Sequence, residues 1–218
     1  MSLSAFFLAI IVVVLGAFTR LADAGLGCPD WPGCYGHLLW PNESHEIIKA
    51  EQAFPDAPVE LDKTWPEMVH RYFAGTLGLL ILSMTILALS AFSKFRHAKI
   101  AERPPIKLPL FLLGLVILQA AFGMWTVTLK LWPQIVTAHL LGGFSTLTLL
   151  WLLGQRLGGQ RWLVNNEQYQ ILQGIKPLLF FSFVVVVLQI ALGGWVSSNL
   201  LHLHALIFLN VLGNGYHL

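Results

Sequence analysis

Five long apolar stretches constrain the fold of this chain more than any other feature of its sequence. They cover roughly residues Ser2–Ala22, Val69–Phe92, Lys107–Leu129, Gln134–Gly154 and Pro177–Ser197. A helix needs about 20 mostly apolar residues to cross a bilayer, and each of these stretches is long enough. Charged residues make up only 11% of the chain, whereas about 25% is usual in soluble domains. The sequence therefore predicts an all-α integral membrane protein, with a four-helix transmembrane bundle and a fifth span.

Several other classes of protein are excluded by the same residues. The net charge of +2 and the scattered basic residues do not suggest nucleic-acid binding. Two cysteines are too few for a disulfide scaffold or a Cys-rich zinc module. The first span lacks the charged start and the cleavage site of a signal peptide, so we expect it to be retained. The apolar segment Leu201–Leu212 is too short to cross a membrane by itself.

The basic residues of the loops predict the orientation of the spans. Loops 94–107 and 155–176 are rich in Lys and Arg, whereas the long loop 23–67 holds most of the acidic residues. Because cytoplasmic loops carry an excess of Lys and Arg, we expect the N-terminus in the cytoplasm and the loop 23–67 outside it. We therefore expect a multi-pass protein of the cell inner membrane, in contact with membrane lipid.

Both cysteines lie in this long loop, separated by a run that contains proline and glycine. Such residues favour a turn that brings Cys28 and Cys34 together, and compartments outside the cytoplasm permit disulfides. A structural disulfide is the simpler interpretation, and a redox-active pair is the alternative. Further along the loop, residues 42–50 have the pattern of a short, capped amphipathic helix.

Two of the spans share a sequence signature that indicates an internal repeat. Leu118–Trp125 and Leu188–Trp195 have Leu, Gln, Ala, Gly and Trp at matching places, and Leu15–Phe18 is a weaker version. Small residues recur by convergence because they let helices pack closely, but this does not explain Gln and Trp. We therefore expect a duplicated helical unit, and the odd number of spans makes its second copy incomplete.

Only two of the eight histidines lie within spans. His70 and His139 both lie near the outer surface, on two spans that run in the same direction. Ionisable residues inside membranes are rare and usually functional. A packing role and a zinc site with Glu67 as a further ligand are alternatives. We favour axial ligation of a haem iron, for which histidine is a common ligand.

The surroundings of the two histidines fit a flat, apolar ligand. Small residues follow each imidazole along its own helix face and leave a slot for a porphyrin. They are Ala74 and Gly78 after His70, and Gly142 and Gly143 after His139. Arg71 and Arg20, near the outer surface, are placed to bind haem propionates. Tight helix packing by the glycines and interfacial anchoring by the arginines are the alternatives.

Glu67 precedes His70 by three residues, so both project from one helix face. Beside a haem in a low-dielectric site, a carboxylate orients an imidazole, accepts a proton or stabilises positive charge. Glu67 is therefore a candidate functional residue. For this residue taken alone, the better interpretation is an interfacial charge that the dipole at a helix N-terminus favours.

Taken together, these segments resemble the haem A synthase family. The resemblance runs through residues 16–36, 67–76, 126–127, 135–143 and 189–199. It implies an oxidoreductase that converts haem O to haem A, by oxidising a ring methyl to a formyl group, for the biogenesis of terminal oxidases. It also implies eight helices in two similar four-helix halves, each with a pair of haem-ligating histidines.

The resemblance also implies roles for single residues of this sequence. His70 and His139 match the haem ligands of the N-terminal half, which takes the substrate, while the second half holds a b-type haem cofactor. Glu67 matches the carboxylate that assists the oxidation, and Cys28 with Cys34 match the pair in the outer loop. The expected partners are haem O as substrate, a haem O synthase and terminal oxidase assembly factors.

The resemblance divides the chain into unequal parts. Residues 1–155 correspond to the haem-binding half, residues 156–199 to the cytoplasmic loop and first helix of a second half, and residues 200–218 to an atypical tail. The second histidine pair finds no match, so we expect a truncated member that binds haem but converts none when expressed alone. The alternative functions are a bis-His b-type electron-transfer subunit and a haem carrier.

Overall fold

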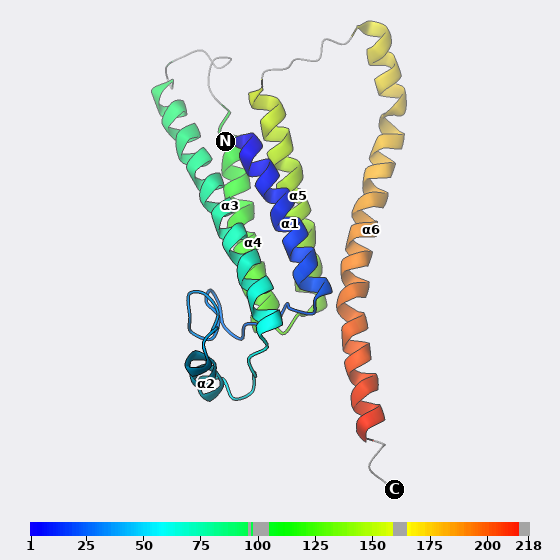
Figure 1. The fold of residues 1–218 in the computed structure, drawn as a ribbon. Helices are drawn as coiled ribbons and strands as arrows, with labels where there is room; N and C mark the ends of the chain where they lie inside the picture. Colours follow the sequence, from blue (N-terminus) through cyan, green and yellow to red (C-terminus); the bar gives the residue numbers. More distant parts are fainter. Residues whose placement is uncertain (96, 98–104, 159–164, 214–218) are drawn as a thin grey trace.

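The computed structural model describes residues 1–95, 97, 105–158 and 165–213, with side chains described as far as residue 199. These residues form six helices (Figure 1): α1 (Ser2–Leu21), α2 (Ser44–Ala53), α3 (Leu61–Lys94), α4 (Lys107–Thr128), α5 (Pro133–Leu157) and α6 (Asn166–Gly213). No β-strand occurs within the described ranges, which confirms the all-α prediction.

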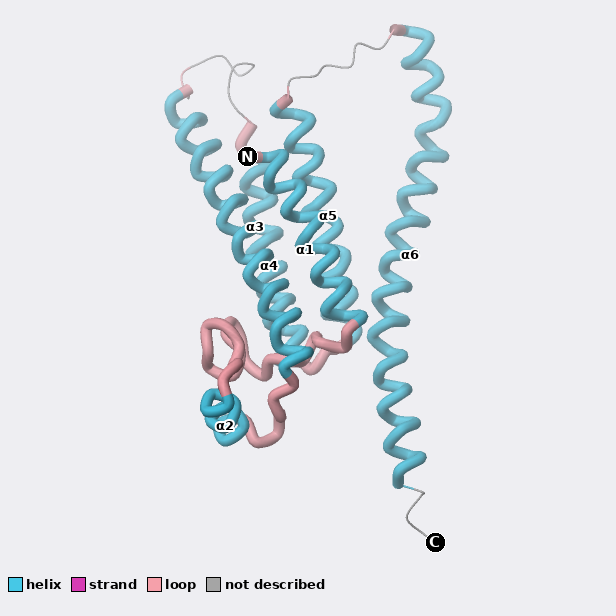
Figure 2. Tube along the Cα trace, viewed as in Figure 1, coloured by secondary structure: helices cyan, strands magenta, loops and turns pink. Residues whose placement is uncertain are grey.

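Four of the helices contact one another in a closed ring, and Figures 1 and 2 show this bundle from the side. Helix α1 contacts α3 and α5, and α4 contacts the same two helices. For the residues that the structure describes, no contact joins α3 to α5 or α1 to α4, so the members of each of these pairs lie diagonally across the bundle. Helix α6 packs along α5, outside the ring. Side chains of α3 and α5 therefore meet only across the bundle interior.

Among the described helices, five are long and apolar enough to cross a membrane: α1, α3, α4, α5 and the part Asn166–Asn199 of α6. The chain is therefore a multi-pass membrane protein, as the sequence predicts. Helix α3 begins at Leu61 rather than at Val69. Its polar first turns remain helical because Thr64 and Met68 are buried against the preceding loop, a contact that hydropathy alone does not register.

Helix α6 is longer than the span from which it was predicted. Its backbone is helical without interruption from Asn166 to Gly213, whereas the sequence predicts a span over Pro177–Ser197. The segment Leu201–Leu212 continues this helix because no proline follows Pro177 to end it.

The largest buried cluster closes the bundle at the end where α1 begins. Its members come from all four helices of the ring: Ala5, Ala9, Leu77, Ile81, Met84, Leu112, Leu150 and Leu153. Thr85 of α3 adds a polar contact by donating to the carbonyl of Pro109 in α4 at 3.1 Å. Because lipid tails are as apolar as these side chains, close packing and such hydrogen bonds hold the helices together. The half of the bundle nearer the end of α1 remains for the polar residues.

Residues 22–43, which we call the Cys loop, fold onto the start of α3. A disulfide joins Cys28 and Cys34, as the sequence predicts. Both cysteines and Tyr35 are buried together with Ala50 of α2 and Met68 of α3. The loop is therefore a packed unit that is anchored on a transmembrane helix.

The predicted short helix is present as α2. It begins with a capping box, in which the Glu43 side chain accepts from the main chain of Glu46. The Glu46 carboxylate accepts the N–H groups of Asn42 and Glu43 at 3.0 and 3.2 Å. These hydrogen bonds, from Asn42 first, hold the pKa of the Glu46 carboxyl below its ordinary value. Figure 1 shows α2 beside the Cys loop, beyond the end of the bundle.

Gly27 tests the contact between the Cys loop and α3, because a Cβ at this position would overlap the carbonyl of Lys63. We expect Gly27→Ala to lower the free energy of unfolding by about 1–3 kcal/mol, the usual cost of overpacking. Thermal unfolding in detergent, followed by circular dichroism, measures the effect. Gly75→Ala is the matched control, because a Cβ at Gly75 enters open space. An unchanged midpoint in Gly27→Ala would contradict the close approach.

Candidate functional site

The two histidines of the spans lie on helices that face each other across the ring. His70 is on α3 and His139 is on α5, which form one of the diagonal pairs. The Nδ1 atom of each imidazole is buried and has no hydrogen-bond partner among the described residues. Because buried polar atoms are normally paired, these two nitrogens mark the polar centre of the bundle.

A glycine of the neighbouring helix lies against each imidazole. A Cβ on Gly16 of α1 would lie 3.0 Å from Cε1 of His70, and a Cβ on Gly123 of α4 would lie 3.6 Å from Cε1 of His139. Each glycine has the same place in the signature that α1 and α4 share. The internal repeat thus has a structural meaning: both copies let a helix approach a histidine closely.

The small residues that follow the histidines along α3 and α5 have different surroundings. A Cβ on Gly78 would contact Val116 of α4 at 3.4 Å, and a Cβ on Gly142 would overlap the side-chain amide of Gln119. For these two glycines the packing interpretation holds, because side chains of α4 occupy the space beside them. Gly143 has open space at its Cβ position.

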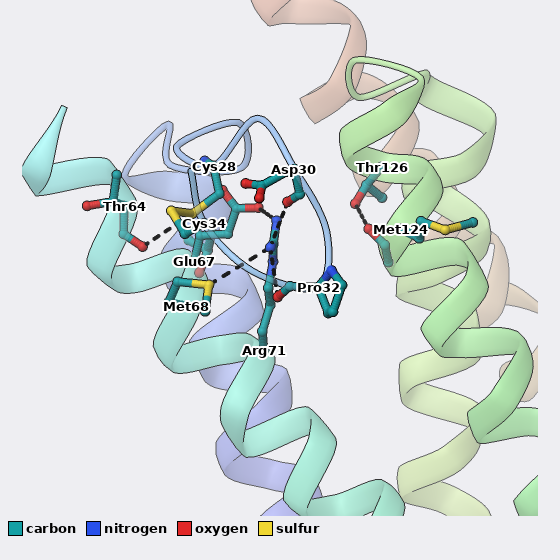
Figure 3. A network of polar contacts seen from close by, with 12 residues as sticks. Cys28, Asp30, Pro32, Cys34, Thr64, Glu67, Met68, Arg71, Met124 and Thr126 are labelled. Atoms are coloured by element: carbon teal, nitrogen blue, oxygen red, sulfur yellow. Dashed lines mark hydrogen bonds and ion pairs between the residues drawn. A yellow bond between two sulfur atoms is a disulfide. The ribbon is translucent and has the colours of Figure 1, made fainter. Parts of the chain in front are cut away.

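Glu67 is held between the Cys loop and Arg71 (Figure 3). Its Oε2 accepts the main-chain N–H of Cys28 at 2.9 Å, and its Oε1 accepts Nη2 of Arg71 at 2.5 Å. Only 5% of the residue is exposed. A buried carboxylate requires a cationic partner and hydrogen bonds of this kind, because its desolvation is otherwise very costly.

Arg71 ties the Cys loop to α3. Its Nη1 donates to the carbonyls of Asp30 at 2.9 Å, Gly33 at 2.5 Å and Pro32 at 3.3 Å. Sequence reasoning considered haem propionates and interfacial anchoring for this side chain and missed these contacts, because any residue offers a main-chain carbonyl. The haem-binding role of Arg71 stays a prediction.

Arg20 joins the ring to α6. Its Nη2 donates to the main-chain carbonyl of Ser197, and its Nε is buried without a partner among the described residues. Sequence reasoning offered interfacial anchoring as the alternative to propionate binding, and it did not foresee that the anchor is another helix.

The donor set of the site suits a haem better than a bare metal ion. The described ranges contain no group of three or more His, Cys, Asp or Glu side chains that could hold a metal. A zinc site needs three or four such ligands, whereas haem iron takes only axial ligands from the protein. Glu67, considered as a third zinc ligand, is bound instead to Arg71 and Cys28.

Comparison with known proteins identifies the family. The COX15-CtaA model, described as cytochrome oxidase assembly protein, matches residues 1–211. The haem A synthase of Shewanella oneidensis is 48% identical over 190 residues, which cover 87% of this chain and 54% of that protein. The chain belongs to the COX15-CtaA family.

Other haem A synthases match less closely. Those of Exiguobacterium sibiricum and Chelativorans sp. are 28% and 27% identical, over 83% and 86% of this chain and 54% and 53% of theirs. The chain therefore spans about half the length of the curated relatives that it matches. No solved structure matches it. Membership of the COX15-CtaA family confirms the resemblance to haem A synthases that the sequence segments suggest.

The Glu67–Arg71 pair predicts how the Cys loop responds to mutation. Arg71→Gln leaves a buried carboxylate without its cation, so we expect dithiothreitol to reduce the Cys28–Cys34 disulfide about tenfold faster or more. The double variant Glu67→Gln/Arg71→Gln should be reduced more slowly than Arg71→Gln alone, because glutamine carries no charge. Maleimide labelling of the released thiols in detergent gives the time course.

Arg156→Gln is the matched control, because Arg156 is exposed in the last turn of α5. It should leave the rate of reduction unchanged. Equal rates for the wild type and Arg71→Gln would show that Arg71 does not hold the loop.

Proposed function

We propose that this chain holds haem O between His70 and His139 and supplies the substrate site for haem A synthesis. The observation that carries the proposal is the pair of buried, unpartnered Nδ1 atoms on diagonally opposed helices. Two imidazoles without a third metal-ligating side chain suit the two axial positions of a haem iron. The haem A synthases among the relatives support haem O as the ligand.

The proposed reaction oxidises a methyl group of haem O to the formyl group of haem A, with external dioxygen as the oxidant and oxygen source and with water as the second product. The bound substrate brings the iron and its redox chemistry to the site. The residues of this chain would bind the ring, exclude water and handle the protons that oxidation of a methyl group releases. The apolar surroundings of the spans favour this arrangement, because a low dielectric strengthens every electrostatic contact inside the bundle.

Glu67 is the proposed carboxylate of the reaction. It lies one helical turn from His70, and the Cys28 N–H and Arg71 fix its two oxygens. Such fixed orientation is what a group needs to stabilise charge that develops on a neighbouring substrate. Arg71 remains the proposed haem-binding residue, because it directly follows the proposed ligand His70 on α3.

The proposed setting is the cell inner membrane, with the N-terminus in the cytoplasm and the Cys loop outside. The distribution of Lys and Arg among the loops supports this orientation.

We further propose that residues 1–155 form one haem-binding unit and that residues 156–199 begin a second unit. The proposed partners of the protein are a haem O synthase and oxidase assembly factors. The b-type haem belongs to the proposed second unit.

A second candidate function is a bis-His b-type haem subunit that transfers electrons or carries haem. The observation that favours it is that both carboxylate oxygens of Glu67 already accept hydrogen bonds from the protein. An electron carrier needs only the two axial ligands. Substitution of Glu67 therefore separates the two functions.

Haem binding by the purified chain tests the first step. We expect His70→Ala and His139→Ala each to lower the haem content at least about tenfold, because each removes an axial ligand. The absorption spectrum of wild type purified from a haem-producing host should be that of a six-coordinate, low-spin haem. His45→Ala, in the exposed part of α2, is the control and should retain full haem content. Retention of haem by both span variants would overturn the proposal.

Glu67→Gln tests the reaction itself. The assay is the ratio of haem A to haem O, from pyridine haemochrome spectra of a host that makes haem O and lacks its own haem A synthase. The chain is co-expressed with the part of the Shewanella oneidensis relative that it does not match. We expect Glu67→Gln to lower the haem A yield about 100-fold or more, as loss of a proton-transferring group does, at unchanged haem content.

Two outcomes of this assay would contradict the assignment. Wild-type haem A yield in Glu67→Gln would show that the carboxylate does not take part. Bound haem without any haem A in the wild-type assay would favour the electron-transfer or carrier function instead.

A further inference from the structure

The ring consists of two helix pairs with equivalent contacts around their histidines. Gly16 of α1 lies against His70, and Gly123 of α4 lies against His139. One helical turn before each glycine stands Val12 in α1 and Gln119 in α4. The two helix pairs are therefore equivalent at the contact between glycine and histidine.

The equivalence ends at the side chains of these two residues. Val12 is apolar, whereas Gln119 carries an amide into the corresponding place. The partner positions differ in the same way. Three residues after His139 stands Gly142, whose missing side chain makes room for the Gln119 amide, and three residues after His70 stands Phe73. The polar group and the space for it thus occur together, on one side of the bundle only.

The side-chain amide nitrogen of Gln119, Nε2, is buried and has no hydrogen-bond partner among the described residues. A buried amide without a partner is unfavourable, and packing alone would be served as well by leucine. Because it lies against Gly142, three residues after His139 on α5, its donor is available to a ligand held by that histidine.

We propose that Gln119 determines specificity, by donating its side-chain N–H to a hydroxyl oxygen on the rim of the haem between His70 and His139. The inference rests on the proposed haem site and names the substrate class, a haem with a hydroxyl-bearing substituent. Haem O carries such a hydroxyl group on its long side chain, and haem B has a vinyl group at that place. Because Val12 and Phe73 hold the corresponding sequence positions on α1 and α3, the same contact would bind the asymmetric ring in one orientation.

The test compares two haems on one set of variants. Ferric haem O and ferric haem B are titrated into the haem-free chain in detergent, and the Soret band gives the two dissociation constants. We expect Gln119→Leu to weaken haem O binding about tenfold, the effect of losing one buried hydrogen bond. Haem B binding should change less than about twofold, because that ligand offers the amide no hydroxyl partner.

A second variant protects the test against misfolding of Gln119→Leu. Gly142→Ala keeps the glutamine but places a Cβ where its amide lies, and the flexible end of Gln119 can move aside. It should weaken haem O selectively in the same way. Gln189→Leu is the matched control, because Gln189 has the same place in the repeated signature but is exposed on α6. It should leave both affinities unchanged.

The outcomes separate this inference from the proposed function. Equal weakening of both haems by Gln119→Leu would indicate contact with a group that both share, such as a propionate, and would overturn the assignment. No weakening of haem O by either variant would overturn it as well. Failure of wild type to bind either haem would overturn the haem site itself and the assignment with it.

Discussion

The approach of two helices to two imidazoles, at Gly16 and at Gly123, is the contact on which the site depends. A bundle in lipid gains little from burying apolar side chains, so its helices come together where small residues permit close packing. Here the small residues lie against histidines, which fixes both imidazoles inside the ring. A larger residue at either position would separate the helices or displace the imidazole. The repeated signature is therefore at once a packing motif and the support of the polar centre.

The Cys loop is a second constraint, and it acts on the same helix. Arg71 binds three main-chain carbonyls of the loop and the Glu67 carboxylate, while Cys28 donates to the other oxygen of Glu67. The loop, its disulfide and the first turns of α3 are thus one hydrogen-bonded unit. Because His70 stands one residue before Arg71, any movement of the loop acts directly on the turn that carries the imidazole.

Much of the fold follows from the sequence, because lipid imposes a simple rule. A spanning segment must satisfy its own backbone, so a long apolar stretch can only be a helix. Five spans could be predicted in this way, whereas the short helix α2 and the Cys28–Cys34 pairing could be predicted from capping and turn residues. The start of α3 could not, because its polar turns are held by tertiary contacts of Thr64 and Met68 rather than by their own hydropathy. The haem-ligand roles of His70 and His139 remain predictions, although the ring brings both residues to its interior.

The sequence by itself determined which ionisable residues are out of place in a membrane: two histidines within apolar runs and one glutamate beside one. Such residues are costly in lipid whatever their neighbours, so composition along the chain is enough to find them. Only the tertiary structure decided how each is accommodated. Glu67 is paired with Arg71 and Cys28, whereas Nδ1 of each histidine and Nε2 of Gln119 are buried without partners. That difference depends on distances between helices far apart in the chain, and spacing along a single helix cannot encode them.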